Sequence, residues 1–243
     1  MLKTEIADCC RRLRLGKNVA TISEQIEAGS NQEYLLKVLK EELSYREAKR
    51  KSRLLKQAGF YSLKTFEGFC FDEIRLPAEL SVDDLKEADF IDEKKNLIFY
   101  GNVGTGKTHL ATAIGVKACS KGKVVRFFRT AALVNQLSNA QKKGELGQLL
   151  ERLSKVDLLI CDEWGYVPLD RDGSKLLFQV VSECYEQRSV IITTNLEFSK
   201  WVNIFYEEQM TAAMIDRLVH HSYLLVFDGQ SYRIKNSLMK NYT

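Results

Sequence analysis

One segment, GNVGTGKT from Gly101 to Thr108, restricts the folds open to this chain more than any other part of the sequence. It fits the pattern G-x-x-x-x-G-K-[ST], follows an apolar run at residues 97–100 and opens a helical pattern. Glycine lets the backbone curl with its N–H groups pointing inward, which offers a polyphosphate many donors without steric bulk. A chance match in such a chain is on the order of one in a hundred. The segment therefore predicts a phosphate-binding loop between a buried strand and a helix.

Each position of this loop has an expected role in binding a nucleoside triphosphate. We expect the Lys107 ammonium to reach the β and γ phosphates and the Thr108 hydroxyl to bind Mg²⁺. The N-terminus of the following helix adds positive potential. The loop therefore predicts ATP and Mg²⁺ as ligands. The residues expected to contact them are Gly101, Asn102, Val103, Gly104, Thr105, Gly106, Lys107 and Thr108.

Two acidic residues, Asp162 and Glu163, follow the apolar run at residues 158–161. In a parallel sheet they would lie at the carboxyl edge, where α/β proteins bind their ligands. We expect Asp162 to contribute to the Mg²⁺ site and Glu163 to polarise the attacking water, which indicates a hydrolase. An apolar strand that ends in Asp-Glu often only enters a solvated loop, but the upstream phosphate-binding loop disfavours that alternative.

Two further polar residues have a functional and an ordinary interpretation. Asn195 follows the apolar run at residues 190–194, where its amide would sense the γ-phosphate or the water, or would simply form a turn. Arg217 lies near the end of a helical pattern. It either reaches the γ-phosphate of a neighbouring subunit or pairs with Asp216 at the surface, and the residues alone leave both alternatives open.

From residue 96 onward, short apolar runs alternate with helical patterns. Short strands that are apolar on both sides and separated by helices predict a parallel sheet covered on both faces. We expect strands at residues 97–100, 124–128, 158–161, 190–194 and 224–227. We expect helices at residues 107–120, 131–140, 147–153, 174–187 and 207–220.

The amino-terminal part is helical in pattern and carries a basic run. Residues 1–62 predict a small all-helical domain with Asn31 as a helix N-cap, residues 63–95 a linker, and residues 96–243 the α/β domain. Between positions 46 and 64, seven Lys and Arg accompany one acidic residue. On a helix, side chains spaced by three or four form one stripe, which suits the phosphates of duplex DNA, although a solvated face is the usual explanation. The residues concerned are Arg46, Lys49, Arg50, Arg53 and Lys56, with Lys142 and Lys143 as a weaker second patch.

Composition excludes several classes of protein. Hydrophobic residues make up 45% of the 243 residues, enough for a folded core, and no apolar run approaches the roughly 18 residues that span a bilayer. The first residues carry charges and no apolar segment of a secretory signal. The six cysteines form no C-x-x-C pair, which predicts buried thiols in the cytoplasm. His220 and His221 are adjacent, so on a helix they would point about 100° apart and would not share a metal.

The chain resembles the AAA+ ATPases, and among them the IstB-like helpers of insertion-sequence transposition and the related DnaC-type helicase loaders. The resemblance covers nearly the whole chain and rests on GNVGTGKTHLATAIG, LLICDEWGYVPLDRDGSKLLFQVV, IITTNLEFSKW, AAMIDRLVHHSYLL and GQSYRIK. It implies a five-stranded parallel sheet in the order 5-1-4-3-2 and a truncated C-terminal lid. It also implies that Asn195 is a first sensor, Arg217 an arginine finger, Arg233 a candidate second sensor, and that Lys142 and Lys143 lie near DNA.

The resemblance further implies a homo-oligomer with ATP between subunits, largely non-specific binding of duplex DNA, and a transposase partner encoded by the same element. We expect ATP-bound subunits to assemble on DNA and hydrolysis to disassemble them. The main alternative is a helicase loader of the DnaC type. A small-molecule kinase and a scaffold that binds ATP without hydrolysis are disfavoured, because neither needs both Asp162 and Glu163.

Overall fold

The computed structural model describes residues 2–16, 18–205, 207–235 and 237, which form two compact units, Met1–Arg53 and Leu54–Thr243. Among the described helices, none combines the length and the apolar character that crossing a bilayer requires. The units divide between Arg53 and Leu54 because Leu54 and Ala58 are buried in the core of the second unit.

The first unit consists of helices α1 (Leu2–Arg12), α2 (Val19–Ile22) and most of α3 (Asn31–Gln57). Non-helical residues separate these three helices. The buried carboxylate of Glu42 accepts hydrogen bonds from the Gly16 amide, at 2.8 Å, and from Arg46 Nε, at 2.6 Å. The prediction of Asn31 as N-cap was wrong by one residue, because Ser30 Oγ accepts the Glu33 N–H and α3 begins at Asn31.

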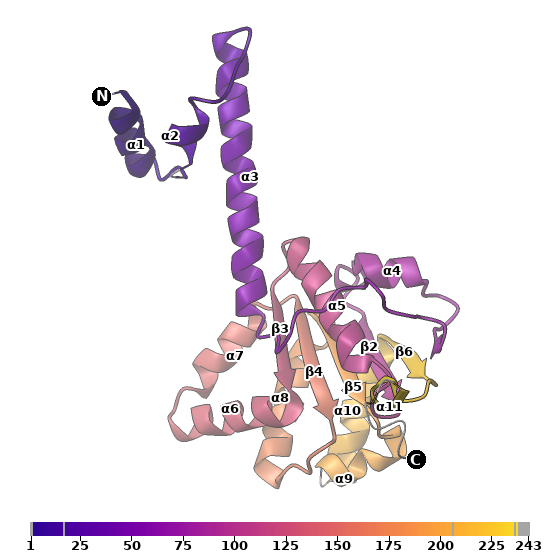
Figure 1. Ribbon diagram of the computed structural model, residues 1–243. Coiled ribbons are helices and arrows are strands. Elements are labelled where there is room, and N and C mark those ends of the chain that lie inside the picture. Colours follow the sequence, from indigo (N-terminus) through magenta and orange to yellow (C-terminus); the bar gives the residue numbers. More distant parts are fainter. Residues whose placement is uncertain (1, 17, 206, 236, 238–243) are drawn as a thin grey trace. The chain divides into compact units, whose positions relative to one another are not determined.

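The second unit is built on a six-stranded sheet in the order β1-β6-β2-β5-β4-β3 (Figure 1). Five strands are parallel, and without β1 their order is the predicted 5-1-4-3-2, which is thereby confirmed. The short β1 pairs antiparallel to β6 at the edge and was not predicted. The strands are β1 (Ile74–Arg75), β2 (Asn96–Gly101), β3 (Val125–Arg129), β4 (Leu158–Trp164), β5 (Ser189–Thr194) and β6 (Ser222–Phe227).

Helices cover both faces of this sheet, as Figure 1 shows. Because side chains alternate along a strand, Leu158 and Ile160 belong to one core cluster, while Leu159 and Cys161 belong to the other. The first cluster includes residues of α4 and α5, and the second includes residues of α6, α8 and α10. The helices are α4 (Val82–Glu87), α5 (Lys107–Ser120), α6 (Thr130–Lys142), α7 (Leu146–Ser154), α8 (Arg171–Cys184), α9 (Val202–Phe205), α10 (Glu208–His220) and α11 (Tyr232–Lys235).

Residues 63–95, expected to be a linker, contribute β1, α4 and part of the core. Leu85 and Ile91 are fully buried against the sheet, whereas the acidic residues between them stay at the surface. Ser81 and Asp84 cap the amino end of α4 reciprocally, so the acidic stretch starts a helix. Among the described residues after β6, α11 is the single helix.

Candidate nucleotide-binding site

The loop between β2 and α5 has the backbone geometry of a phosphate cradle. Gly104 and Gly106 have φ angles of 82° and 96°, in the left-handed region that favours glycine. A Cβ atom at Gly104 would lie 2.2 Å from Ser231 Oγ, and one at Gly106 would lie 3.1 Å from the Phe69 ring. A side chain at position 104 would therefore clash with Ser231, and one at position 106 would crowd the Phe69 ring.

The Lys107 ammonium folds back onto this loop. Its Nζ donates to the carbonyl oxygens of Gly101, at 2.7 Å, and Asn102, at 2.6 Å. The pKa of Lys107 is lowered to about 8, chiefly by burial and to a smaller extent by Arg233, while the carboxylate of Asp162 acts in the opposite direction. A polyanion in the cradle would favour the charged form of this lysine.

Asp162 connects strand β4 with helix α5 and strand β5 at the carboxyl edge of the sheet. The buried carboxylate accepts hydrogen bonds from Thr108 Oγ1, at 2.9 Å, and from Thr193 Oγ1, at 2.5 Å. Thr193 belongs to β5, which lies between β2 and β4 and so reaches both neighbours. Two of the predicted residues, Thr108 and Asp162, are thus in direct contact, and Thr193 is a member that the sequence interpretation missed.

Glu163 occupies an irregular position of β4. Its φ of 58° is left-handed, and the register of β4 against β5 shifts between Cys161 and Trp164. Such a conformation costs a non-glycine residue about 1–2 kcal/mol. The Glu163 N–H donates to Thr193 Oγ1 at 3.0 Å, and its half-buried carboxylate lies 3.4 Å from Arg129 Nε. The register shift thus falls at the residue that was predicted to polarise the attacking water.

A cavity of about 620 Å³ opens over the cradle. Residues 103–108 of the phosphate-binding loop line it together with Glu163, Asn195 and Arg233, so most predicted nucleotide-contacting residues share one space. Gly101, Asn102 and Asp162 are not among the lining residues. The other walls of the cavity come from residues outside the predicted motifs. Among these residues are Ser62, Lys64, Phe69, Cys70, His109, Tyr166 and Tyr232.

Phe69 and Phe71 both precede the sheet in the sequence, and the structure gives them different surroundings. Phe69 lines the cavity, and its ring centroid lies 5.0 Å from that of His109. Phe71 packs edge-on against Phe69 and against the core cluster, so it supports Phe69 from behind.

Arg217 lies apart from the residues that line the cavity. On α10, its guanidinium donates to the Ala213 carbonyl at 3.2 Å and lies 5.0 Å from the centroid of the Phe178 ring. Within one chain, therefore, the structure does not bring Arg217 together with the cradle.

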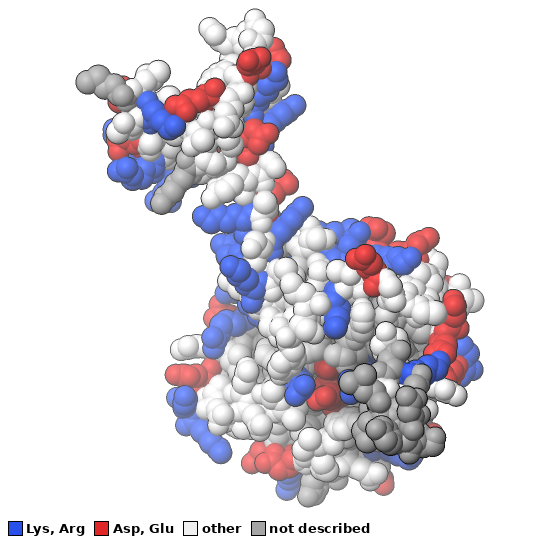
Figure 2. All heavy atoms as spheres, in the orientation of Figure 1, with Lys and Arg blue, Asp and Glu red and all other residues white. Residues whose placement is uncertain are grey.

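The predicted DNA-binding residues are exposed, and Figure 2 shows basic side chains gathered along the C-terminal half of α3. Lys49 lies over the Tyr45 ring at 5.9 Å from its centroid. Arg46 differs from the rest, because it pairs with Glu42 and donates to the Arg14 carbonyl at 2.7 Å. The exposed residues are Arg46, Lys49, Arg50, Arg53, Lys56, Lys142 and Lys143.

A parallel sheet of this order, with the glycine loop after β2 and the acidic pair at the end of β4, defines an AAA+ nucleotide-binding protein of the P-loop class. The sequence profile of the family described as IstB-like ATP binding protein matches residues 13–240. The chain belongs to this family.

Two relatives and two solved structures illustrate the similarity. The "Insertion sequence IS5376 putative ATP-binding protein" of Geobacillus stearothermophilus is 34% identical over 98% of this chain and 97% of its own length. The "Insertion sequence IS21 putative ATP-binding protein" of Pseudomonas aeruginosa is 36% identical over 84% and 77%. AMPPCP-bound DnaA from Aquifex aeolicus superposes with a TM-score of 0.56 at 22% identity, over 73% of this chain and 54% of that one. The crystal structure of DnaI also superposes with a TM-score of 0.56, at 17% identity, over 76% of this chain and 99% of the DnaI chain. Both solved structures therefore have the same fold as this chain.

Proposed function

We propose that this protein is an ATP-hydrolysing helper of insertion-sequence transposition, which assembles on duplex DNA and recruits the transposase encoded by the same element. One observation carries the proposal: a nearly full-length match to insertion-sequence ATP-binding proteins coincides with a cavity lined by the phosphate-binding loop. The cytoplasm, where chromosomal DNA is accessible in bacteria, is the proposed location.

The residues at the cradle fit ATP with Mg²⁺. Thr108 and Asp162 present a hydroxyl and a buried carboxylate 2.9 Å apart, and such hard oxygen ligands suit Mg²⁺. Bound there, the ion neutralises phosphate charge. Lys107 contacts the β and γ phosphates, Glu163 orients the attacking water, and Phe69 packs against the base. Both carboxylates at this edge favour hydrolysis over a scaffold role or phosphorylation of a small molecule.

Three residues respond to the nucleotide in this proposal. Asn195 and Arg233 line the cavity and act as first and second sensors of the γ-phosphate. Arg217 acts on the nucleotide of a neighbouring subunit, because within its own chain it contacts Ala213 and Phe178 and not the nucleotide cavity. Hydrolysis then requires an oligomer, because each site is completed by the next subunit.

DNA binding is assigned to the basic stripe of α3, defined as Lys49, Arg50, Arg53 and Lys56, and to Lys142 and Lys143. These exposed cations contact phosphates and read no bases, which agrees with binding of varied target sequences. Arg46 belongs to the same helix, but its pairing with Glu42 gives it a mainly structural part.

The direct experiment uses Glu163→Gln, which should bind ATP, hydrolyse it slowly and accumulate as an oligomer on duplex DNA in electron micrographs. Normal turnover by this variant would remove Glu163 from water activation. Arg217→Ala mixed with wild-type subunits should reduce hydrolysis while ATP binding to the monomer persists. An unchanged rate would mean that Arg217 is an ordinary surface residue.

A helicase loader of the DnaC type remains the second candidate, because DnaI, a protein with the same fold, matches over 76% of this chain. A pull-down with the ATP-bound Glu163→Gln protein separates the candidates. Retention of the transposase supports the transposition helper, whereas retention of the replicative helicase alone supports the loader.

A further inference from the structure

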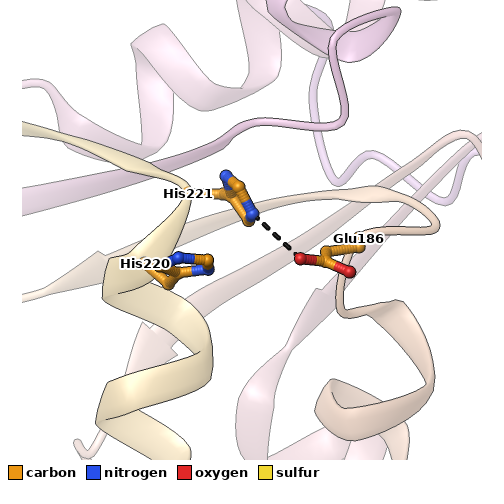
Figure 3. Close-up of side chains that lie close together, drawn as sticks. All are labelled: Glu186, His220 and His221. Carbon is orange, nitrogen blue, oxygen red and sulfur yellow. Dashed lines mark hydrogen bonds and ion pairs between the residues drawn. The ribbon is translucent and has the colours of Figure 1, made fainter.

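A second cluster of ligating side chains lies away from the nucleotide cavity. One donor atom each from Glu186, His220 and His221 lies within 4.8 Å of the other two (Figure 3). The expectation that the two histidines diverge was wrong, because α10 ends at His220 and His221 has φ of −122° and ψ of 38°, outside the helix. Their ring centroids are 4.1 Å apart.

The cluster lies at the amino ends of β5 and β6, the two strands that flank β2 in the sheet. Glu186 lies in the turn between α8 and β5, and the two histidines lie where α10 passes into β6. The phosphate-binding loop follows the carboxyl end of β2, which is parallel to both β5 and β6. The cluster and the nucleotide site therefore lie at opposite edges of one sheet.

We propose that Glu186, His220 and His221 form a binding site for a divalent transition-metal ion of the Zn²⁺ type. Two imidazoles and one carboxylate are a common zinc-binding set, with a fourth position left for water. Ligands about 2.0–2.1 Å from a tetrahedral zinc lie about 3.3–3.5 Å from one another. His221 Nε2 and Glu186 Oε1 already approach to 3.1 Å, so rotation of exposed side chains brings in the remaining ligand.

The surrounding backbone and side chains hold these ligands in position. The backbone N–H groups of Gln187 and Arg188 both donate to the Cys184 carbonyl and fix the turn that carries Glu186. The His221 carbonyl accepts a hydrogen bond from the Asn96 N–H at 2.7 Å, which anchors the residue to β2. Tyr185 Oη lies 2.8 Å from His220 Nδ1 and orients that ring, as outer hydrogen bonds do for metal-binding histidines.

A bound ion would connect the end of α8 with the end of α10. Arg217 lies on the last turn of α10, one turn before His221, so the ion would also restrain the segment that carries this arginine. The site itself is formed by three residues outside the nucleotide cavity, and metal binding there does not depend on the proposed function.

The test is a zinc titration of the nucleotide-free, tag-free protein, followed by calorimetry. Exposed thiols also bind zinc, so Cys9→Ser and Cys70→Ser are introduced into every protein compared. This parent should bind one Zn²⁺ per chain, bind Co²⁺ with the visible spectrum of a four-coordinate ion, and unfold at a higher temperature with zinc than without it.

Variants then assign the ligands. His220→Ala, His221→Ala and Glu186→Gln should each weaken zinc binding at least about tenfold and abolish the zinc-dependent rise in unfolding temperature. Glu183→Gln and His109→Ala remove a nearby acid and the third histidine, and both should bind as the parent does. Unfolding curves without metal show whether each variant is folded, and because Glu186 and His220 are exposed, at least these two variants should be. A parent that binds no stoichiometric zinc, or folded ligand variants with parental affinity, would overturn the proposal.

Discussion

Arg129 Nε, at the end of β3, lies 3.4 Å from Glu163 Oε2, at the end of β4. The carboxylate assigned to water activation is therefore paired with a cation in the structure. Exposed pairs of this kind contribute up to about 1 kcal/mol, enough to bias the position of a side chain without locking it.

We predict that Arg129→Ala raises ATP hydrolysis in the absence of DNA by about two- to fivefold, the equivalent of a pair worth up to about 1 kcal/mol. The measurement is steady-state phosphate release. Arg126→Ala, which removes the neighbouring arginine of β3 bound to the Gln57 carbonyl, is the control and should leave the rate unchanged. A lower rate in Arg129→Ala would mean that this cation supports the reaction.

Replacing Lys107 with alanine should weaken ATP binding by about two orders of magnitude, because the cradle loses the cation that contacts the β and γ phosphates. Equilibrium binding of a fluorescent ATP analogue measures the loss. Lys117→Ala on the same helix removes a partly exposed lysine paired with Glu87 and serves as control. Retained ATP affinity in Lys107→Ala would refute the assignment of the loop.

The lowered pKa of Lys107 predicts a pH dependence of ATP binding. Above about pH 8 the free protein loses this charge, while bound phosphates favour the protonated form, so ATP binding takes up a proton and weakens as the pH rises. The same lowered pKa affects the stability of the free protein. Between about pH 8 and the ordinary lysine pKa of 10.5, the unfolded chain binds more protons at Lys107 than the folded protein does, so the free energy of unfolding rises with pH in this range. A lysine whose pKa is raised by an acidic partner would show the opposite trend. Calorimetry in buffers of different ionisation enthalpy measures the proton uptake, which should be absent in Lys107→Met.

Gly104→Ala should weaken ATP binding at least about tenfold, because the new Cβ meets Ser231 Oγ at 2.2 Å as well as adopting a left-handed φ. Gly122→Ala is a matched control, since Gly122 has a φ of 84° and open space around it. It should lower the free energy of unfolding by about 1 kcal/mol and leave ATP affinity unchanged. If the clash is the cause, Ser231→Gly in the Gly104→Ala protein should restore part of the affinity.

Neutralising the basic stripe of α3 should reduce the salt dependence of DNA binding. Substituting Lys49, Arg50, Arg53 and Lys56 with glutamine removes four cations, so the slope of log K against log salt should fall by about 3–4. Fluorescence anisotropy of a duplex over a salt series measures this slope. Arg46→Ala should instead destabilise the first unit, because it leaves the buried Glu42 carboxylate without its cation. An unaltered slope in the fourfold variant would mean that these residues do not contact DNA and form an ordinary solvated helix face.

Local patterns were sufficient to predict the cradle and the five parallel strands. The loop from Gly101 to Thr108 is contiguous, and the burial of nearly every residue of β4 follows from its apolar run. Contacts between distant segments were not predictable in the same way. Thr193 joins the site only because the sheet order places β5 between β2 and β4, and Phe69 joins it only because its segment folds back over the loop.

Two errors came from the exact end of a helix. Asn31 was taken as a cap although Ser30 has that role, and His220 and His221 were treated as two residues of one helix. Sequence patterns place helix ends within a few residues at best, and a difference of one residue reverses the direction of a side chain. Geometry at the end of α10 therefore had to come from the structure.

The single hydroxyl of Thr193 donates to the Asp162 carboxylate and accepts from the Glu163 amide. Serine and threonine have a short side chain whose single hydroxyl can donate one hydrogen bond and accept another. Threonine is also β-branched, which suits a buried strand. Relatives of this protein should accordingly carry only serine or threonine at the position of Thr193. Valine has nearly the same shape as threonine, but it has no hydroxyl to make the two hydrogen bonds.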